Sequence, residues 1–129
     1  MSFTMNDMIG TTIEAVEVAE DKKTLTFRTN YGSQIIFYHE QDCCERVEIE
    51  DISGDLNDLV GAPIVQAEES ISSNVTPIGA EPPEREDYSF TWTFYRFATT
   101  KGYATIRWYG GSNGYYSERV DIKVVPRDR

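Results

Sequence analysis

The chain has few of the residues on which most catalytic and metal sites depend, and it has no long hydrophobic run. Its 129 residues include one histidine and two cysteines. No stretch approaches the ~20 apolar residues that a membrane-spanning helix needs. Residues 1–15 lack the basic start and the apolar core of a signal peptide. The sequence therefore predicts a cytoplasmic protein that does not contact membranes.

Basic residues are also scarce, since 12 Lys and Arg stand against 22 Asp and Glu, for a formal net charge of −10. This balance argues against direct binding of nucleic acids or anionic membranes, because both depend on Lys and Arg to neutralise phosphate. The negative charge is concentrated between residues 39 and 69, where ten acidic residues accompany one arginine. A basic protein partner is compatible with this segment.

The two cysteines, Cys43 and Cys44, are adjacent. Neighbouring side chains of a strand point to opposite faces, which makes them poor disulfide partners. We therefore expect both to be reduced, as in the cytosol, and one of them to pack in the core as a small apolar side chain.

Apolar and polar residues alternate with period two along most of the chain, and no amphipathic helical stretch of about ten residues is present. Strands are predicted at residues 12–18, 25–28, 34–38, 46–52, 64–71, 88–97, 103–109 and 115–125. An N-cap candidate at Asp55 and a terminal Gly61 predict one short helix near 55–60. We expect a mainly β, or β-dominated α+β, single domain over 1–129, built as a single antiparallel sheet or a small sandwich of about seven to eight strands.

Residues 72–87 contain three prolines and almost no large apolar side chain. Burial there cannot offset the entropy lost on ordering, so the segment is predicted to be a flexible loop. It separates an acidic first half from an aromatic second half.

The aromatic half predicts a three-stranded meander, with Ala104, Ile106 and Trp108 on one face and with Trp92 and Phe94 in the core. The opposite face carries tyrosines and arginines, which offer stacking surfaces and forked donors for phosphate. We interpret this face as a site for a small nucleotide-like ligand, although cross-strand Tyr and Arg pairs also stabilise exposed sheets. The candidate ligand-binding residues are Tyr95, Arg96, Tyr103, Arg107, Tyr109, Tyr115, Ser117 and Arg119.

A second candidate site is an acidic motif that begins with the block His-Glu-Gln-Asp-Cys-Cys-Glu. Its spacing does not fit structural zinc, whereas Ca²⁺ or Mg²⁺ would accept the carboxylates. The negative field opposes a cysteine nucleophile. The alternative is a capped turn in which Asp42 accepts backbone N–H groups. No metal or cofactor is assigned to the motif, whose residues are His39, Glu40, Asp42, Cys43, Cys44, Glu45, Glu48 and Glu50.

The same block, followed by Val-Glu-Ile-Glu-Asp-Ile at 47–52, Gly-Asp-Leu at 54–56, Arg-Trp-Tyr-Gly at 107–110 and Gly-Tyr-Tyr-Ser at 114–117, resembles a family of small phage and bacterial proteins. The family has no established activity to transfer. What the resemblance implies is a phage or prophage origin, a location in the host cytosol, and an accessory role.

Three functions follow from these observations. The first is a non-enzymatic phage protein that sequesters a nucleotide-like host defence signal. The second is an acidic inhibitor that docks on a host nucleic-acid-binding enzyme. The third is a metal-dependent hydrolase that uses the carboxylates of the acidic motif. Exposed sheet edges also make a homo-oligomer compatible with the sequence.

Overall fold

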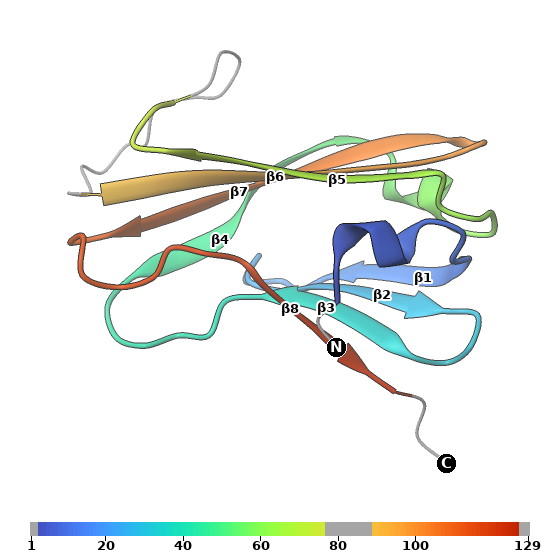
Figure 1. Ribbon diagram of the computed structural model, residues 1–129, viewed down its shortest axis with the longest axis horizontal. Helices are drawn as coiled ribbons and strands as arrows, with labels where there is room; N and C mark the ends of the chain where they lie inside the picture. Colours follow the sequence, from blue (N-terminus) through green and yellow to red (C-terminus); the bar gives the residue numbers. More distant parts are fainter. Residues whose placement is uncertain (1–2, 77–88, 127–129) are drawn as a thin grey trace.

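A computed structural model describes residues 3–76 and 89–126, which form a sandwich of two four-stranded antiparallel sheets (Figure 1). The first sheet has the order β1 (Ile13–Val18), β2 (Leu25–Thr29), β3 (Gln34–Tyr38) and β8 (Asp121–Val125). The second has the order β4 (Arg46–Gly54), β7 (Gly102–Ser112), β6 (Ser89–Thr99) and β5 (Gln66–Ser73). The prediction of a mainly β chain is confirmed, and the strands divide into two sheets.

The only helical elements among the described residues are two short 3-10 turns, η1 (Met5–Met8) and η2 (Leu56–Leu59). The helix predicted near 55–60 is therefore a single turn. Its predicted cap is present, since the Asp55 carboxylate accepts a hydrogen bond of 2.9 Å from the backbone N–H of Asn57. None of the described helices is long and apolar enough to cross a membrane.

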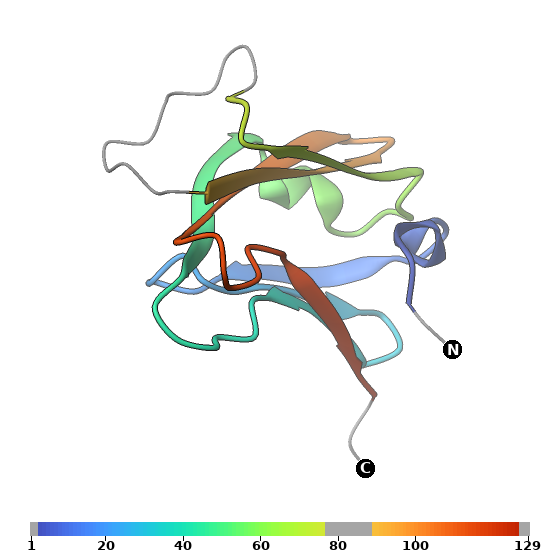
Figure 2. The ribbon, with the colours of Figure 1, turned by 60° about the vertical axis from the view of Figure 1, so that its left-hand side comes forward.

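The core lies between the two sheets, which face each other as layers in Figure 2. Phe37 packs edge-on against Phe27, Tyr95 and Phe97, with ring centroids 4.8 to 5.9 Å apart. Rings in this arrangement place the positive edge of one against the negative face of another. Aromatic side chains from both halves of the sequence therefore build one core.

The alternation of β7 is confirmed, because Ala104, Ile106 and Trp108 are fully buried in this core. The prediction for β6 is wrong by one residue. Tyr95 and Phe97 face the core, so Trp92 and Phe94 point to the outer face of the second sheet. Both faces of β6 are aromatic, and for this reason its sequence did not reveal which face is buried.

The meander predicted at 88–125 is also wrong in its third strand. β6 and β7 form the expected hairpin, but β8 pairs with β3 in the other sheet. β7 continues to Ser112, beyond the strand end predicted at residue 109, and the chain then crosses between the sheets. Gly110 permits this path, since a Cβ there would lie 2.6 Å from the Glu118 carbonyl oxygen.

The predicted loop at 72–87 begins later than expected, because Ser72 and Ser73 still belong to β5. The strand predicted at 64–71 is correspondingly found two residues further on. Residues 77–87 of the predicted loop lie outside the described residues.

Candidate functional site

Two connections pass between the sheets at the same end of the sandwich, and together they form what we call the crossover end, residues 39–45 and 113–120 (Figure 1). The first connects β3 to β4 and contains the histidine and cysteine block. The second connects β7 to β8. The Glu40 N–H donates to the carboxylate of Asp121, the first residue of β8, at 2.9 Å, so the first connection is bonded to the start of β8.

His39 is the central residue of the crossover end. Its Nδ1 lies 2.7 Å from the Arg119 carbonyl oxygen, and its Nε2 lies 2.7 Å from the Glu45 carboxylate. The carbonyl oxygen can only accept, so Nδ1 donates to it, and Nε2 is engaged by the Glu45 carboxylate. The His39 side chain is 3% exposed and that of Glu45 is 0% exposed, so this hydrogen-bonded pair is buried.

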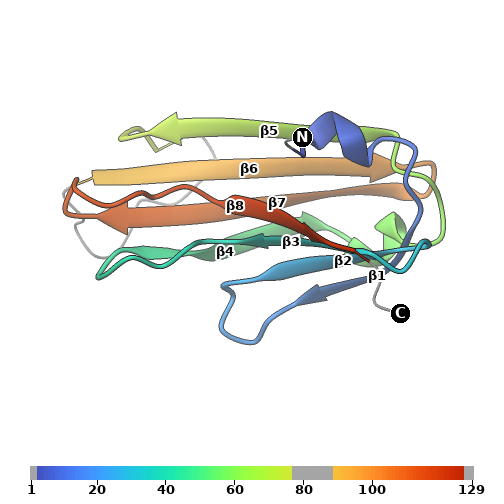
Figure 3. The same ribbon diagram turned by 60° about the horizontal axis from the view of Figure 1, so that its bottom comes forward.

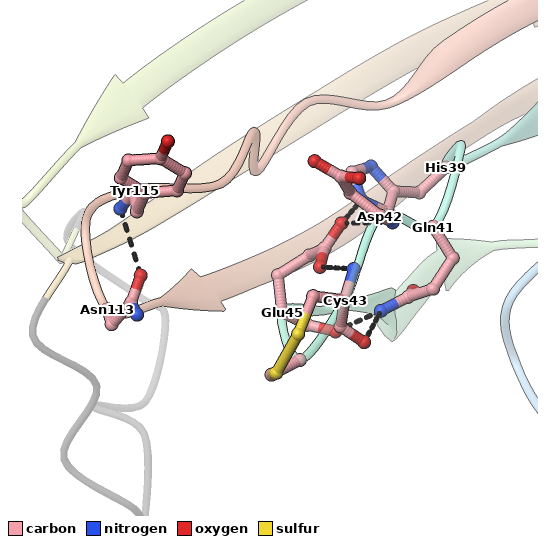
Figure 4. Close-up of a disulfide and its surroundings, with 8 residues drawn as sticks. His39, Gln41, Asp42, Cys43, Glu45, Asn113 and Tyr115 are labelled. Atoms are coloured by element: carbon pink, nitrogen blue, oxygen red, sulfur yellow. Dashed lines mark hydrogen bonds and ion pairs between the residues drawn. A yellow bond between two sulfur atoms is a disulfide. The ribbon is translucent and has the colours of Figure 1, made fainter.

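The Glu45 carboxylate accepts hydrogen bonds at both oxygens (Figure 4). Besides His39, the donors are the backbone N–H groups of Asp42 and Cys43, at 2.8 and 2.9 Å. Burial works against ionisation, but the bonds from His39 and from the backbone outweigh it and lower the pKa of Glu45 from 4.5 to about 2. Glu45, and not Asp42, is thus the acid that caps this turn.

Gln41 completes the turn, because its side-chain amide donates to the carbonyl oxygens of Cys43 and Glu45 at 3.2 and 2.7 Å. Cys43 and Cys44 lie at the tip, both exposed, and they are joined by a disulfide (Figure 4). The predictions of two thiols and of one buried cysteine are both wrong. The residues lie in a loop, where the alternation of a strand does not apply.

The second connection is held by a buried carboxylate of its own. Glu118 accepts hydrogen bonds from the hydroxyl groups of Thr91, at 2.7 Å, and Ser112. The Ser117 hydroxyl accepts from the Arg119 N–H, which fixes the chain just before it reaches His39. Both connections are therefore built around a buried glutamate.

This geometry limits the chemistry of the acidic motif. Both nitrogens of His39 and both oxygens of Glu45 are engaged, and the cysteines are bonded to each other. Within residues 3–76 and 89–126, no three His, Cys, Asp or Glu side chains are grouped so that they could hold a metal ion. Within the motif, His39 and Glu45 hold the first connection in its fold.

The outer face of the second sheet carries a different arrangement, a layer of arginines, aromatic rings and glutamates on β4, β7 and β6. The Arg46 guanidinium lies over the Tyr109 ring, and that of Arg107 lies over the Trp92 ring, at 5.4 and 5.6 Å from the ring centroids. Trp92 meets Tyr109 edge-on at 5.0 Å. The two rings are 1% and 3% exposed, although they face away from the core.

Glutamates of β4 hold the two guanidinium groups. Glu50 pairs with Arg107 at 2.5 Å, and Glu48 pairs with Arg46 at 3.3 Å. Glu48 stands opposite Tyr109 in the pairing of β4 with β7. The acidic motif and the ligand-binding residues, which were predicted from the sequence as two sites, therefore lie partly on one surface.

Two donors on this face lack an acceptor. The Nε atom of Arg46 and the Nε1 atom of Trp92 are buried, and neither has a hydrogen-bond partner in the structure. Most buried polar groups in folded proteins are paired, so each exception requires a physical explanation. Both donors adjoin Tyr109, which places them within one small region. Neither residue was among the predicted ligand-binding residues, since Trp92 was assigned to the core and Arg46 to no site.

The structure does not gather the predicted ligand-binding residues on one face. Arg107 and Tyr109 lie on the outer face, and Arg96 lies there too, over the Phe94 ring and bonded to Ser70 on β5. Tyr103 is exposed at the start of β7. The remaining four residues lie elsewhere.

Tyr115, Ser117 and Arg119 belong to the crossover end and do not pair with β7 as a strand, because the strands paired with β7 are β4 and β6. Tyr95 is fully buried in the core. Burial raises the pKa of its phenol far above the usual range, and the nearby Glu69 carboxylate adds to the effect. Tyr95 is therefore a neutral core residue and not part of a surface site.

The acidic segment does not form one continuous surface either. Glu45 is buried, and Glu48 and Glu50 are paired with arginines. Glu68 and Glu69 lie on β5, at the opposite edge of the second sheet from β4. Glu40 and Asp42 remain exposed near the cysteine tip.

Comparison with known proteins places the chain in a family. Residues 6–122 match a domain of unknown function, DUF7448. The chain belongs to this family. None of the curated proteins and none of the solved structures matches it. The matched span includes both connections of the crossover end and every strand of the outer face.

Proposed function

We propose that this DUF7448 protein is a non-enzymatic binding protein that captures a small, flat, negatively charged ligand of the nucleotide class on the outer face of the second sheet. The observation that carries the proposal is the pair of buried donors, Arg46 Nε and Trp92 Nε1, on either side of Tyr109. A buried donor without a partner costs about 1–3 kcal/mol. An acceptor group of a ligand would remove that cost.

The surrounding side chains suit such a ligand. Aromatic rings stack on bases, and guanidinium groups bind phosphate through two parallel hydrogen bonds. Glu48 and Glu50 hold Arg46 and Arg107 in place before any ligand arrives. A phosphate that exchanges with these carboxylates would meet arginines that are already ordered, which lowers the entropy lost on binding.

The biological setting of the proposal comes from the resemblance to phage proteins. In a phage-infected cell, a captured nucleotide would be a host defence signal, and capture would lower its free concentration without chemical conversion. What supports the absence of conversion is the crossover end, where His39, Glu45 and the two cysteines are all engaged.

The experiment is native mass spectrometry of the protein purified from its host, followed by heat release and analysis of the supernatant for nucleotides. We expect an added mass that disappears on heating and a nucleotide in the supernatant. Arg46→Lys keeps the charge but removes Nε, so this variant should carry less ligand. Arg28→Lys is the matched control, since Arg28 pairs with Glu14 on the first sheet and both side chains are exposed.

A protein that carries no ligand, and that binds none of a panel of mono- and dinucleotides in calorimetry, would contradict the proposal. Equal loading of Arg46→Lys and the unchanged protein would show that the ligand lies elsewhere.

A further inference from the structure

Strand β5 forms an open edge of the second sheet (Figure 3). Among the described strands it pairs only with β6, through eight consecutive residues without a shift of register. The other side of such a strand presents N–H and C=O groups that a further strand could use.

The other three edges carry features that oppose the addition of a strand. The pairing of β4 shifts between Ile49 and Asp51, and that of β1 shifts between Ile13 and Ala15. β8 is five residues long, contains Lys123 and is followed by a proline. Bulges, short length, lysine and proline are the usual ways in which proteins protect sheet edges. β5 has none of these four features; it carries Glu68 and Glu69, and η1 packs beside it.

The side chains of β5 indicate what could bind there. Ile71 is 52% exposed, and two exposed valines, Val65 and Val75, flank the strand. Glu68 and Glu69 are both exposed, and as neighbours in a strand they point to opposite faces. Carboxylates therefore stand on both faces of the open edge, beside an aliphatic side chain.

We propose that β5 binds an extended segment of a partner protein that carries Lys or Arg next to aliphatic residues, and that this segment adds to the second sheet as a further strand. Charge selects such a partner over a second copy, because two paired β5 strands would bring four carboxylates together between chains of net charge −10. Main-chain hydrogen bonds would supply affinity, and the carboxylates would select basic residues. The interface is separate from the ligand site on the outer face.

The test uses two synthetic peptides, one of alternating Lys and Val and one in which proline replaces each valine. Both carry the same charge, but the second cannot pair as a strand. We expect only the first to bind, with protection of the 66–73 amides in hydrogen exchange. Ile71→Lys should weaken binding roughly tenfold, since an added lysine protects an edge. Val124→Lys on β8, where Val124 is 44% exposed, is the matched control and should bind normally.

Equal binding of the two peptides, absence of binding, or protection at other amides would overturn the proposal. So would a dimer that Ile71→Lys converts to a monomer, because the occupant would then be a second copy. Trp92→Phe should leave peptide binding unchanged, so failure of this proposal and failure of ligand capture are distinguishable.

Discussion

The crossover end and the outer face of the second sheet differ in how their polar groups are satisfied. At the crossover end, the residues that look most reactive in the sequence, His39 and Glu45, hydrogen-bond each other and the backbone. On the outer face, Arg46 and Trp92 each keep a buried donor without a partner. A dense cluster of chemical groups can therefore be architectural, whereas the unpartnered donors of the outer face are the ones for which we propose a ligand.

Glu45→Gln tests how the crossover end is held together, and it is expected to have the largest effect. The amide can no longer accept at both positions, so at least one buried donor of this turn loses its acceptor. We expect the largest loss of unfolding free energy among the variants described here, measured by urea denaturation. Glu17→Gln on the exposed edge of β1 is the control and should change little. Similar stability of the two variants would show that the crossover end is not held by Glu45.

The same residue predicts a pH dependence. The pKa of Glu45 is lowered in the folded state, so its contribution to stability is complete above pH 4.5 and is lost as the pH falls towards about 2. Glu45→Gln lacks this contribution at every pH. The difference in unfolding free energy between the two proteins should thus shrink between pH 4.5 and 2. A difference that stays constant over this range would contradict the assignment.

Gly110→Ala tests whether the second connection is held close to β7. The new Cβ would meet the Glu118 backbone oxygen at 2.6 Å, so the connection must move away from β7. Overpacking of this kind costs about 1–3 kcal/mol. Thr105→Ala, on the same strand but on its outer face, is the comparison in thermal unfolding. Unchanged stability of Gly110→Ala would show that the connection is free to shift.

Trp92→Phe tests the outer face with a smaller expected effect. It keeps an aromatic ring and removes the unpartnered donor, which offsets part of the stability lost to the cavity that the smaller ring leaves. Ligand affinity should fall about tenfold, since a net hydrogen bond contributes about 0.5–1.5 kcal/mol. Trp108→Phe in the core should also lower stability but should leave affinity normal. Calorimetry with the released nucleotide measures affinity, and loss of stability without loss of affinity in Trp92→Phe would refute the assignment.

The smallest effect is expected from the double variant Cys43→Ser and Cys44→Ser. Both residues are exposed, and a disulfide between neighbours closes too short a loop to constrain the unfolded chain. Thermal unfolding with and without a reductant should therefore give closely similar midpoints. A large decrease would mean that the cysteine tip holds the Glu45 turn in place and is part of the network.

Much of the fold could be predicted from the sequence, because alternation is a local property. The strand at 34–38 and the cap at Asp55 were found as predicted. The path of the last strand was not, since the close approach of Gly110 to Glu118 joins residues that no local pattern relates. Sheet membership depends on such contacts and not on propensity.

For the candidate sites, the sequence indicated residue types but not their partners. Arg107 and Tyr109 were placed on one face, yet their neighbours Arg46 and Glu50 come from a strand more than fifty residues earlier. Trp92 was assigned to the core because large aromatic residues are usually buried there. Only the buried side of β6, fixed by Phe97 and Tyr95, shows that its indole belongs to the outer face.

The most direct test of the central claim is an NMR titration of the two indole N–H signals with a nucleotide panel. Both indole nitrogens are buried and without a partner, but Trp92 lies on the outer face and Trp108 in the core. The account predicts that a binding nucleotide shifts the Trp92 signal downfield, as a new acceptor would, and leaves the Trp108 signal in place. Nucleotide binding that moves neither signal, or a panel in which no nucleotide binds, would contradict it.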